Sequence, residues 1–373
     1  MKFTNLSAAP LILASITLAQ EPSASFLTKL DASMPALLEK HREPGIAVAF
    51  VDRCQASVRV YGVANREQAA QVRADTVFNL GSISKMFTAW SVMTLVEEGR
   101  VKLDEPVETY LKRWHLPDSA FERRGVTVRR LLNHTAGISV HGVAGTDRDR
   151  AIPSLIDELN GAGPSKSRVQ VVKEPGAGFQ YSGGGYAILQ LLVEDMTGRP
   201  LAEYARDKVF RPLGMKSTSF NWTDELAARA ATPYRKDGSA TTLRQFSAAG
   251  AAGLLSTAQD MSVFLLAHCA AGDAPPGRGV LKPQTLEQMR KGGVAMQAGT
   301  NARYALGYLM VPGPTSQYDV AGHSGSNIGW KAEVLMMPSA GLGIAVLTNS
   351  DLGELRREVK EIFGAEVRSR VRR

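Results

Sequence analysis

Two residues in the first third of the chain could together perform nucleophilic catalysis. Serine is a poor nucleophile unless a base takes its proton, so a hydrolytic serine needs a base within hydrogen-bond reach. Ser82 and Lys85 occur in the segment GSISK (81–85), and residues three apart on a helix share one face. Burial lowers the pKa of a lysine side chain, which lets such a residue act as a base. The spacing therefore predicts an activated serine at the start of a helix.

The start of a helix suits this chemistry for a second reason. Its free backbone N–H groups can stabilise the anionic oxygen of a tetrahedral intermediate. The motif alone is weak, because residue frequencies predict roughly one chance S-x-x-K in a chain of this size, and this chain has only that one. On the motif alone, a structural helix start is the better interpretation.

Two further polar residues strengthen the catalytic interpretation. Tyr181 begins the segment YSG (181–183) in a turn-rich stretch, where its hydroxyl could relay a proton to the serine or the leaving group. His323 lies in GHSGS (322–326), between strand-like runs, where an edge strand could line a cleft. Taken singly, Tyr181 could equally be a buried aromatic residue, and a histidine near a strand end is more often structural. The three motifs in this order are much harder to explain by chance.

The remaining clustered polar residues indicate structure rather than chemistry. We interpret Asn133, His134 and Thr135 as a capping and turn device that closes a helix before Gly137. The segment GHSG misses the G-x-S-x-G elbow of α/β-hydrolases by one position. The other histidines show no metal-ligand spacing and accompany no H-E-x-x-H or C-x-x-C motif; they are His41, His115, His141 and His268.

The elements that must position these residues follow from the hydrophobic pattern. Residues 45–51 are apolar and β-branched and 58–65 follow a short polar turn, which predicts a β-hairpin at the edge of a sheet. Residues 84–101 carry apolar side chains at helical spacing. They predict a buried helix with Gly99 at its C-cap.

The middle of the chain, 103–234, is mostly helical by pattern, and short strand-like runs return near its end. The clearest helical pieces are 126–135, 186–198, 201–214 and 260–270; the strand-like runs are 305–311, 330–338 and 341–349, and a final helix follows. Strands at both ends with helices between them predict an α+β fold, in which the termini build one sheet around a helical insertion. Short glycine turns between the strands favour antiparallel pairing.

Composition sets the outer limits of the fold. The chain has 373 residues, 44% hydrophobic and 21% charged, as expected of a globular protein with a sizeable core. No Pro/Gly/Ser-rich or charged linker divides it. We therefore expect one body, with a sheet domain formed by 20–85 and 240–373 and a helical subdomain formed by 86–239.

The N-terminus reads as a targeting segment. A basic Lys2 precedes a mostly apolar run from Leu11 to Ala19, which predicts a signal peptide over 1–19 with cleavage near Ala19; a frayed N-terminal helix is the alternative. No later segment is apolar for long enough to cross a bilayer. We expect an exported protein, periplasmic or secreted, without a transmembrane anchor after signal removal.

The net charge of +8 does not predict nucleic-acid binding. The two arginine clusters, 123–130 and 368–373, do not alternate with aromatic residues as a stacking platform would, so solvated surface is the better interpretation. Cys54 and Cys269 are the only cysteines, and we favour two unpaired structural thiols, although an exported compartment would permit a disulfide. The oligomeric state cannot be read from the sequence.

The ordered motifs resemble those of the serine β-lactamase and penicillin-binding protein superfamily, in particular its class C, DD-peptidase and family VIII esterase-like branch. The resemblance runs from about residue 44 to 349 and rests on SISK (82–85), YSG (181–183) and HSG (323–325). It implies an antiparallel sheet flanked by helices, an all-helical subdomain and an active site between the two. It implies no metal and no organic cofactor.

The same resemblance implies roles for individual residues. Ser82 would be the acylated nucleophile, Lys85 its base and Tyr181 a proton relay. His323 stands where most relatives have the lysine of K-T-G, and with it Ser324, Gly325 and Ser326 would bind substrate. The backbone N–H groups of Ser82 and Ser326 would form the oxyanion hole.

Two departures from the family pattern limit the choice of substrate. The second motif usually ends in Asn, but position 183 is Gly. The third motif has His323 instead of lysine, and an ordinary histidine is mostly neutral at pH 7, which weakens recognition of a substrate carboxylate. The leading hypothesis is an acyl-enzyme hydrolase of amide, lactam or D-amino-acid peptide bonds. A carboxylesterase and a penicillin-acylated sensor with little turnover are the alternatives.

Overall fold

The computed structural model describes residues 24–270, 274–313 and 319–371. The predicted signal peptide, 1–19, lies outside the described residues. Within them, no helix is both long and apolar enough to cross a membrane.

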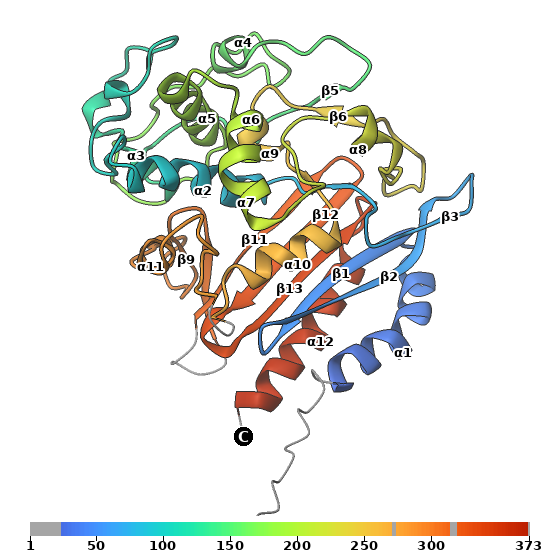
Figure 1. Cartoon of the computed structure of the whole chain (residues 1–373). Coiled ribbons are helices and arrows are strands. Elements are labelled where there is room, and N and C mark those ends of the chain that lie inside the picture. The colour runs from blue at the N-terminus through green and yellow to red at the C-terminus, as the bar shows by residue number, and fades with distance from the viewer. Residues whose placement is uncertain (1–23, 271–273, 314–318, 372–373) are drawn as a thin grey trace, which may run out of the picture.

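The described strands form one large sheet of nine strands, in the order β3-β2-β1-β13-β12-β11-β10-β9-β8 (Figure 1). The strands are β1 (Gly45–Asp52), β2 (Gln55–Asn65), β3 (Ala70–Gln71), β8 (Val294–Ala295), β9 (Arg303–Tyr304), β10 (Leu309–Pro312), β11 (Asp319–Asn327), β12 (Trp330–Met337) and β13 (Leu342–Thr348). Every neighbouring pair in this sheet is antiparallel. The predicted antiparallel α+β fold is confirmed, with the two ends of the chain meeting where β1 pairs with β13.

The central strands are buried on both faces, as β1 illustrates. All eight of its residues are buried, and because side chains alternate across a strand, they enter two different cores. Ile46, Val48 and Phe50 pack with helices α1 (Ala24–His41) and α12 (Glu354–Val371). The alternate residues face α10 (Ala258–Leu266). The sheet is therefore a middle layer between helices, as Figure 1 shows.

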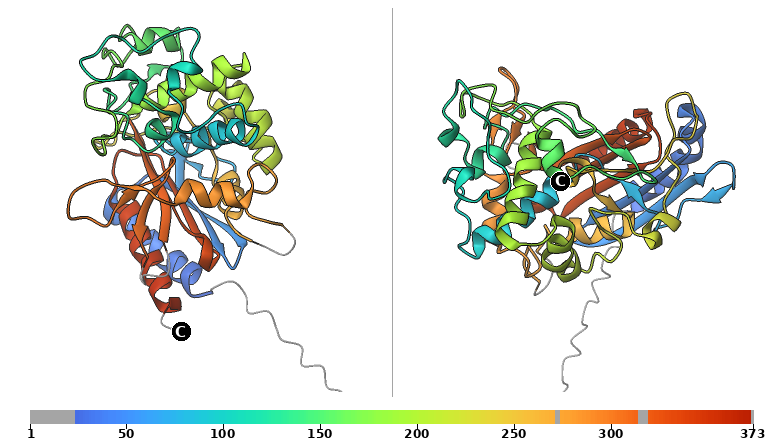
Figure 2. Two further views of the ribbon diagram at one scale, coloured as in Figure 1. Left: turned by 90° about the vertical axis from the view of Figure 1, so that its left-hand side faces the viewer. Right: turned by 90° about the horizontal axis from the view of Figure 1, so that it is seen from above.

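The helical region lies at one end of this sheet, as the two views in Figure 2 show. Its elements are α2 (Ser84–Glu97), η1 (Val107–Thr109), η2 (Arg123–Gly125), α3 (Val128–Leu132), α4 (Leu155–Leu159), α5 (Gly183–Thr197), α6 (Leu201–Ala205), the π-helical η3 (Arg206–Phe210), α7 (Arg211–Leu213), α8 (Asp224–Ala228) and α9 (Ala249–Ala252). Four short strands are associated with it: β4 (Phe78–Asn79) pairs with β7 (Leu255–Ser256), and β5 (Thr146–Asp147) with β6 (Arg244–Gln245). The division at 85/86 and 239/240 remains our proposal.

Helix α2 confirms the prediction of a buried helix. Its residues from Ser84 to Leu95 are all buried, so the helix is covered on every side and packs between the sheet and the helical region. It ends at Glu97, and Gly99, with φ of +70°, follows its C-cap. A left-handed backbone at this point is what glycine allows without strain.

Some elements differ from the sequence-based expectation. The strand expected over 305–311 begins only at Leu309, because Ala305 N–H bonds back to the Tyr308 carbonyl in a turn through Gly307. The HSG segment lies inside β11 rather than between strands. Helices α1 and α11 (Pro283–Arg290) were not predicted. Both cysteines are free thiols.

Candidate active site

Ser82 lies in the tight turn that joins β4 to α2. The Ile83 N–H donates to the Leu80 carbonyl at 3.2 Å, and the Ser84 N–H to the Gly81 carbonyl at 3.0 Å. The Ser84 hydroxyl donates to the same Gly81 oxygen at 2.6 Å. The turn is thus fixed by three hydrogen bonds, while Ser82 itself is only partly buried and lines a cavity.

Lys85, one helical turn after Ser82, lies beside the serine as the spacing predicted. Its ammonium lies 3.2 Å from the Ser82 hydroxyl and donates to the Ala251 carbonyl at 2.7 Å. It also lies 4.9 Å from the centre of the Tyr181 ring and 5.6 Å from that of Tyr186. Only 2% of the residue is exposed, so its Nζ atom is shielded from bulk water.

Two glycines bring the backbone of β11 against the serine turn. A Cβ atom on Gly81 would lie 2.5 Å from the Ser326 backbone nitrogen, and one on Gly325 would lie 3.3 Å from that of Ser82. No other residue type allows so close an approach. The Ser82 and Ser326 amides therefore lie near one another, in an arrangement that could bind a developing oxyanion.

A pair of asparagines joins the serine turn to the sheet. Asn327, at the end of β11, donates through Nδ2 to Asn79 Oδ1 and, at 2.9 Å, to the Ala252 carbonyl. The same Asn79 oxygen accepts the Gly81 N–H at 3.0 Å. This network fixes the position of the serine relative to β11.

Tyr181 lies just before α5, against a histidine whose position the sequence did not reveal. The His134 ring packs on Tyr181 with centroids 4.3 Å apart, and its Nδ1 accepts the Ser182 N–H at 3.1 Å. Burial, followed by the charge of Lys85, holds the His134 pKa well below its usual value, so the ring is neutral. No partner for its buried Nε2 is found among the described residues.

The turn predicted at residues 133–135 is also present. Thr135 donates to the Asn133 side chain at 2.6 Å, and His134 has a φ of +60°. The turn directs the histidine ring inward, toward Tyr181. No local pattern could show this, because the two residues are distant in sequence.

His323 is a neutral residue with both ring nitrogens engaged. Nε2 lies 2.9 Å from the Tyr304 hydroxyl and Nδ1 lies 2.6 Å from the Ser324 carbonyl. Since a carbonyl only accepts, we assign the proton to Nδ1 and the tyrosine as donor to Nε2. Burial, followed by the charge of Lys85, lowers the pKa of His323 to about 3. The side chain therefore supplies neither a positive charge nor a free nitrogen to a substrate.

These residues face a common cavity of about 530 Å³. It brings together the predicted Ser82, Tyr181 and the 323–326 segment, whereas Lys85 lies behind its wall. The sequence did not indicate the other lining residues, which are His141, Gly142, Phe179, Met296, Tyr304, Leu309, Lys331 and Arg356.

Position 183, where relatives usually have Asn, is closely packed. A Cβ atom on Gly183 would lie 3.2 Å from the His141 carbonyl and 3.3 Å from the Val143 side chain. The Gly183 N–H donates to that same carbonyl at 2.9 Å. The segment 141–143 thus occupies space that a side chain at position 183 would need.

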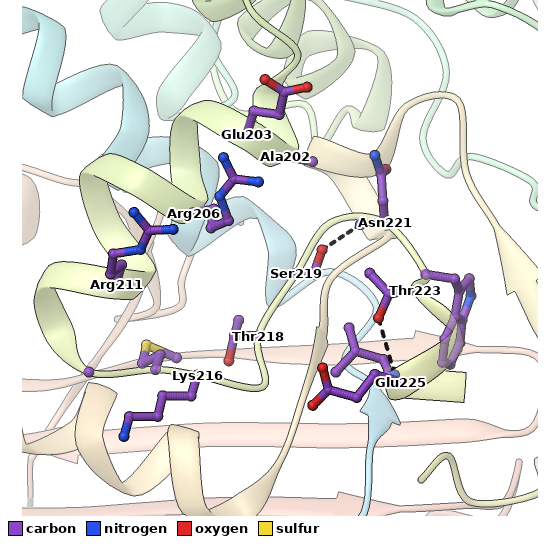
Figure 3. A pocket seen from close by; sticks show the side chains of 14 residues that line it. Ala202, Glu203, Arg206, Arg211, Lys216, Thr218, Ser219, Asn221, Thr223 and Glu225 are labelled. Atoms are coloured by element: carbon purple, nitrogen blue, oxygen red, sulfur yellow. Dashed lines mark hydrogen bonds between the residues drawn. The ribbon is translucent and has the colours of Figure 1, made fainter. Parts of the chain in front are cut away.

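A second, slightly larger cavity of about 600 Å³ lies elsewhere, beside α6, α7 and α8 (Figure 3). It contains none of the predicted site residues. Its lining residues include one serine, Ser219, whose hydroxyl accepts the Asn221 N–H at 3.0 Å. In the described part of the chain, no group of three or more His, Cys, Asp or Glu residues could hold a metal ion in either place.

The fold and this arrangement define a class of protein. The chain belongs to the beta-lactamase family, whose model matches residues 30–368. The family comprises serine hydrolases with the β-lactamase/transpeptidase-like fold.

Individual relatives carry different names. The chain is 30% identical over 331 residues to "Penicillin-binding protein 4" of Amycolatopsis lactamdurans, covering 84% of this chain and 83% of that protein. It is 34% identical over 232 residues to "Esterase EstB" of Burkholderia gladioli, covering 60% and 58%. Among solved structures, the octameric penicillin-binding protein homologue from Pyrococcus abyssi is 26% identical with a TM-score of 0.72, covering 87% of this chain and 74% of that one.

Proposed function

We propose that the protein is a serine acyl hydrolase that forms an acyl-enzyme on Ser82. The observation that carries the proposal is the 3.2 Å contact between the buried Lys85 ammonium and the Ser82 hydroxyl, at the edge of a cavity large enough for a small substrate. A nucleophile within reach of a single buried base is the arrangement that serine activation requires.

The two half-reactions use the residues already described. In the first, a neutral Lys85 amine accepts the Ser82 proton while Oγ attacks the substrate carbonyl carbon, and the Ser82 and Ser326 N–H groups bind the resulting oxyanion. The carbonyl reforms, the bond to the leaving group breaks, and the leaving group takes the proton through Lys85 or Tyr181. In the second, water attacks the acyl carbon, the acid product leaves, and the proton returns to Ser82.

For the substrate, we favour an amide, lactam or D-amino-acid peptide bond. A carboxylesterase on the same scaffold is the second candidate, and it is supported by the side-chain-free position 183 and by the neutral His323, which both reduce specific recognition. The names of the relatives include penicillin-binding proteins and an esterase, so they support both candidates. A protein that is acylated but barely turns over is the third.

Intact-mass spectrometry tests nucleophile and substrate class together. The protein is incubated with a panel of lactams, p-nitrophenyl esters and D-alanyl-D-alanine peptides, and the mass of the covalent adduct and the release of product are followed. We expect an adduct that is absent in Ser82→Ala but present in Ser219→Ala, which removes the hydroxyl in the other cavity. Turnover retained in Ser82→Ala would refute the proposal, and a stable adduct without product would favour the sensor.

Export is a separate proposal, supported by the apolar run at Leu11–Ala19. It predicts that protein recovered from outside the cytoplasm begins close to residue 20. Intact mass of the recovered protein measures this directly. Recovery only from the cytoplasm, with the first 19 residues still attached, would contradict it.

A further inference from the structure

The two cysteines of the chain, distant in sequence, meet at one end of the large sheet. Cys54 lies in the two-residue turn between β1 and β2, since Asp52 pairs with Gln55 across it. This turn is at the end of the sheet away from the helical region (Figure 1). Cys269 follows the C-terminal end of α10, the helix that packs on β1 and β13. The pair therefore connects the sheet to the helix that covers it.

The Cys54 thiol lies against the segment that contains Cys269. Its Sγ donates to the Ala270 carbonyl at 3.2 Å. Burial, followed by a hydrogen bond with the Cys54 thiol, raises the pKa of Cys269, so the two thiols are in contact. Cys269 is 2% exposed, whereas Cys54 is partly exposed. One sulfur is accessible to a reagent in solution, and the other is shielded directly behind it.

Local turn chemistry does not account for a cysteine at position 54. Arg53 and Cys54 have φ values of 46° and 58°, a left-handed pair for which Asn and Gly are the favoured residues. The turn is fixed by its neighbour instead, because the Cys54 N–H donates to the Gly341 carbonyl at 3.3 Å. A Cβ atom on Gly341 would lie 3.4 Å from the Cys54 sulfur. The turn between β12 and β13 thus holds this sulfur in a defined position.

We propose that Cys54 and Cys269 are an oxidation site and form an intramolecular disulfide bond after export. The oxidant is itself a disulfide, either a small one such as oxidised glutathione or one carried by a thiol-oxidising protein. The Cys54 thiolate attacks it, forms a mixed disulfide and releases one thiol. The Cys269 sulfur then attacks the Cys54 sulfur, and the second thiol leaves. Two electrons pass to the oxidant, and the two cysteine protons end on its two thiols.

The bond would close a loop that contains the whole helical region. Helices α2 to α9 and the Ser82 turn all lie between residues 54 and 269. Joining the ends of so long a loop restricts the unfolded chain far more than the folded one. Neither cysteine lines the cavity at Ser82. We therefore expect a more stable protein with unchanged chemistry at the serine.

This inference rests on the proposed export only for its natural oxidant, because disulfides persist outside the cytoplasm. The test is therefore made in solution with the full chain. Protein purified in reductant is transferred, folded, into a mixture of oxidised and reduced glutathione, and is then denatured in iodoacetamide. Intact mass should show two alkyl groups before oxidation and none after it. A non-reducing peptide map should join the peptides that contain Cys54 and Cys269.

Single variants are the matched controls for this bond. Cys54→Ser and Cys269→Ala each leave one cysteine, which should be alkylated or joined to glutathione after the same treatment. Two alkylated thiols in the oxidised wild type would overturn the inference. So would a glutathione adduct that remains on Cys54, or a disulfide between two copies of the chain.

Thermal unfolding separates a native pair from a bond forced on a distorted chain. Oxidised wild type should melt about 5 °C above the reduced protein, whereas Cys54→Ser should melt at one temperature in both buffers. Hydrolysis of a p-nitrophenyl ester should change by less than about twofold on oxidation. A lower melting temperature after oxidation would overturn the inference. Loss of all Ser82 adducts, or recovery only from the cytoplasm, would instead overturn the proposed function or the proposed export and leave this result unaffected.

Discussion

A serine and a lysine three residues apart occur at each of the two cavities, with opposite consequences. Ser82 and Lys85 are three residues apart, as are Lys216 and Ser219. In the first pair the two side chains are 3.2 Å apart and the lysine is buried. In the second, Lys216 is exposed and its ammonium points away from Ser219 (Figure 3). Spacing creates a reactive pair only where a helical turn aligns the residues and packing removes water from the base.

The cavities also differ in how the chain builds them. All lining residues of the larger one come from a single stretch, 202–226. The cavity at Ser82 draws on segments from residue 82 to residue 356, on both the sheet and the helical region. Size is therefore a poor guide to function here, because the larger cavity lacks the convergence of distant groups that chemistry needs.

Removal of the buried base Lys85 should have the largest effect on catalysis. Lys85→Met keeps the length of the side chain but cannot accept a proton, so we expect kcat/KM for a p-nitrophenyl ester to fall about 10³- to 10⁴-fold. Single-turnover acylation rates measure this. A loss below about tenfold would mean that Lys85 is not the base.

Disruption of the close backbone contact at Gly81 should have the next largest effect on catalysis. Gly81→Ala would force a Cβ atom to within 2.5 Å of the Ser326 nitrogen, so the two amides must separate. We expect kcat to fall about 10²-fold, as when one oxyanion donor is lost. Gly99→Ala is the matched control, because Gly99 also has a positive φ but would meet nothing within 4 Å. Equal losses in both variants would assign the effect to backbone strain instead.

The buried histidine predicts how stability depends on pH. Unfolded His323 titrates near 6.5, whereas in the folded protein its pKa is about 3. Between these values the unfolded state binds a proton that the folded state does not. The free energy of unfolding therefore falls on acidification below about pH 6.5, by up to about 1.4 kcal/mol per pH unit for this one group.

Urea unfolding between pH 4.5 and 7 measures the slope. His323→Gln should make it shallower by about that amount. An identical slope in wild type and His323→Gln would show that the folded histidine takes up a proton normally. The buried His134 and His268 have lowered pKa values as well, so part of the slope should remain.

Substitutions in the larger cavity should have the smallest effect on catalysis. The double variant Lys216→Met, Ser219→Ala removes its serine and lysine together, and we expect ester hydrolysis within about twofold of wild type, as for most surface changes. Steady-state kinetics on the same ester test this. A loss comparable to that of Lys85→Met would reverse our assignment of the two cavities.

The features that the sequence predicted depend on residues that are close together in the chain. The features that it did not predict depend on contacts between distant segments. Ser82 and Lys85 can be placed together from the sequence because one helical turn separates them. Strands β1 and β2 and helix α2 can be predicted because their hydrophobic patterns are local. The contact of His134 with Tyr181 and the position of Lys331 beside Ser326 depend on how distant segments pack. Neither leaves a periodic signal. Strand β11 was obscured by Gly322 and Gly325, which are poor strand formers yet are required where backbones approach closely.

The pairing of β1 with β13 has a consequence for how the chain folds. Ile46 lies opposite Thr348, so two neighbouring central strands of the sheet are synthesised far apart in time. Contacts between residues so far apart in sequence form late and slowly. Until β13 has been synthesised, β1 exposes one edge and an apolar surface on both faces, and the nascent chain cannot complete its core. The growing polypeptide should therefore need protection from aggregation until β13 has emerged.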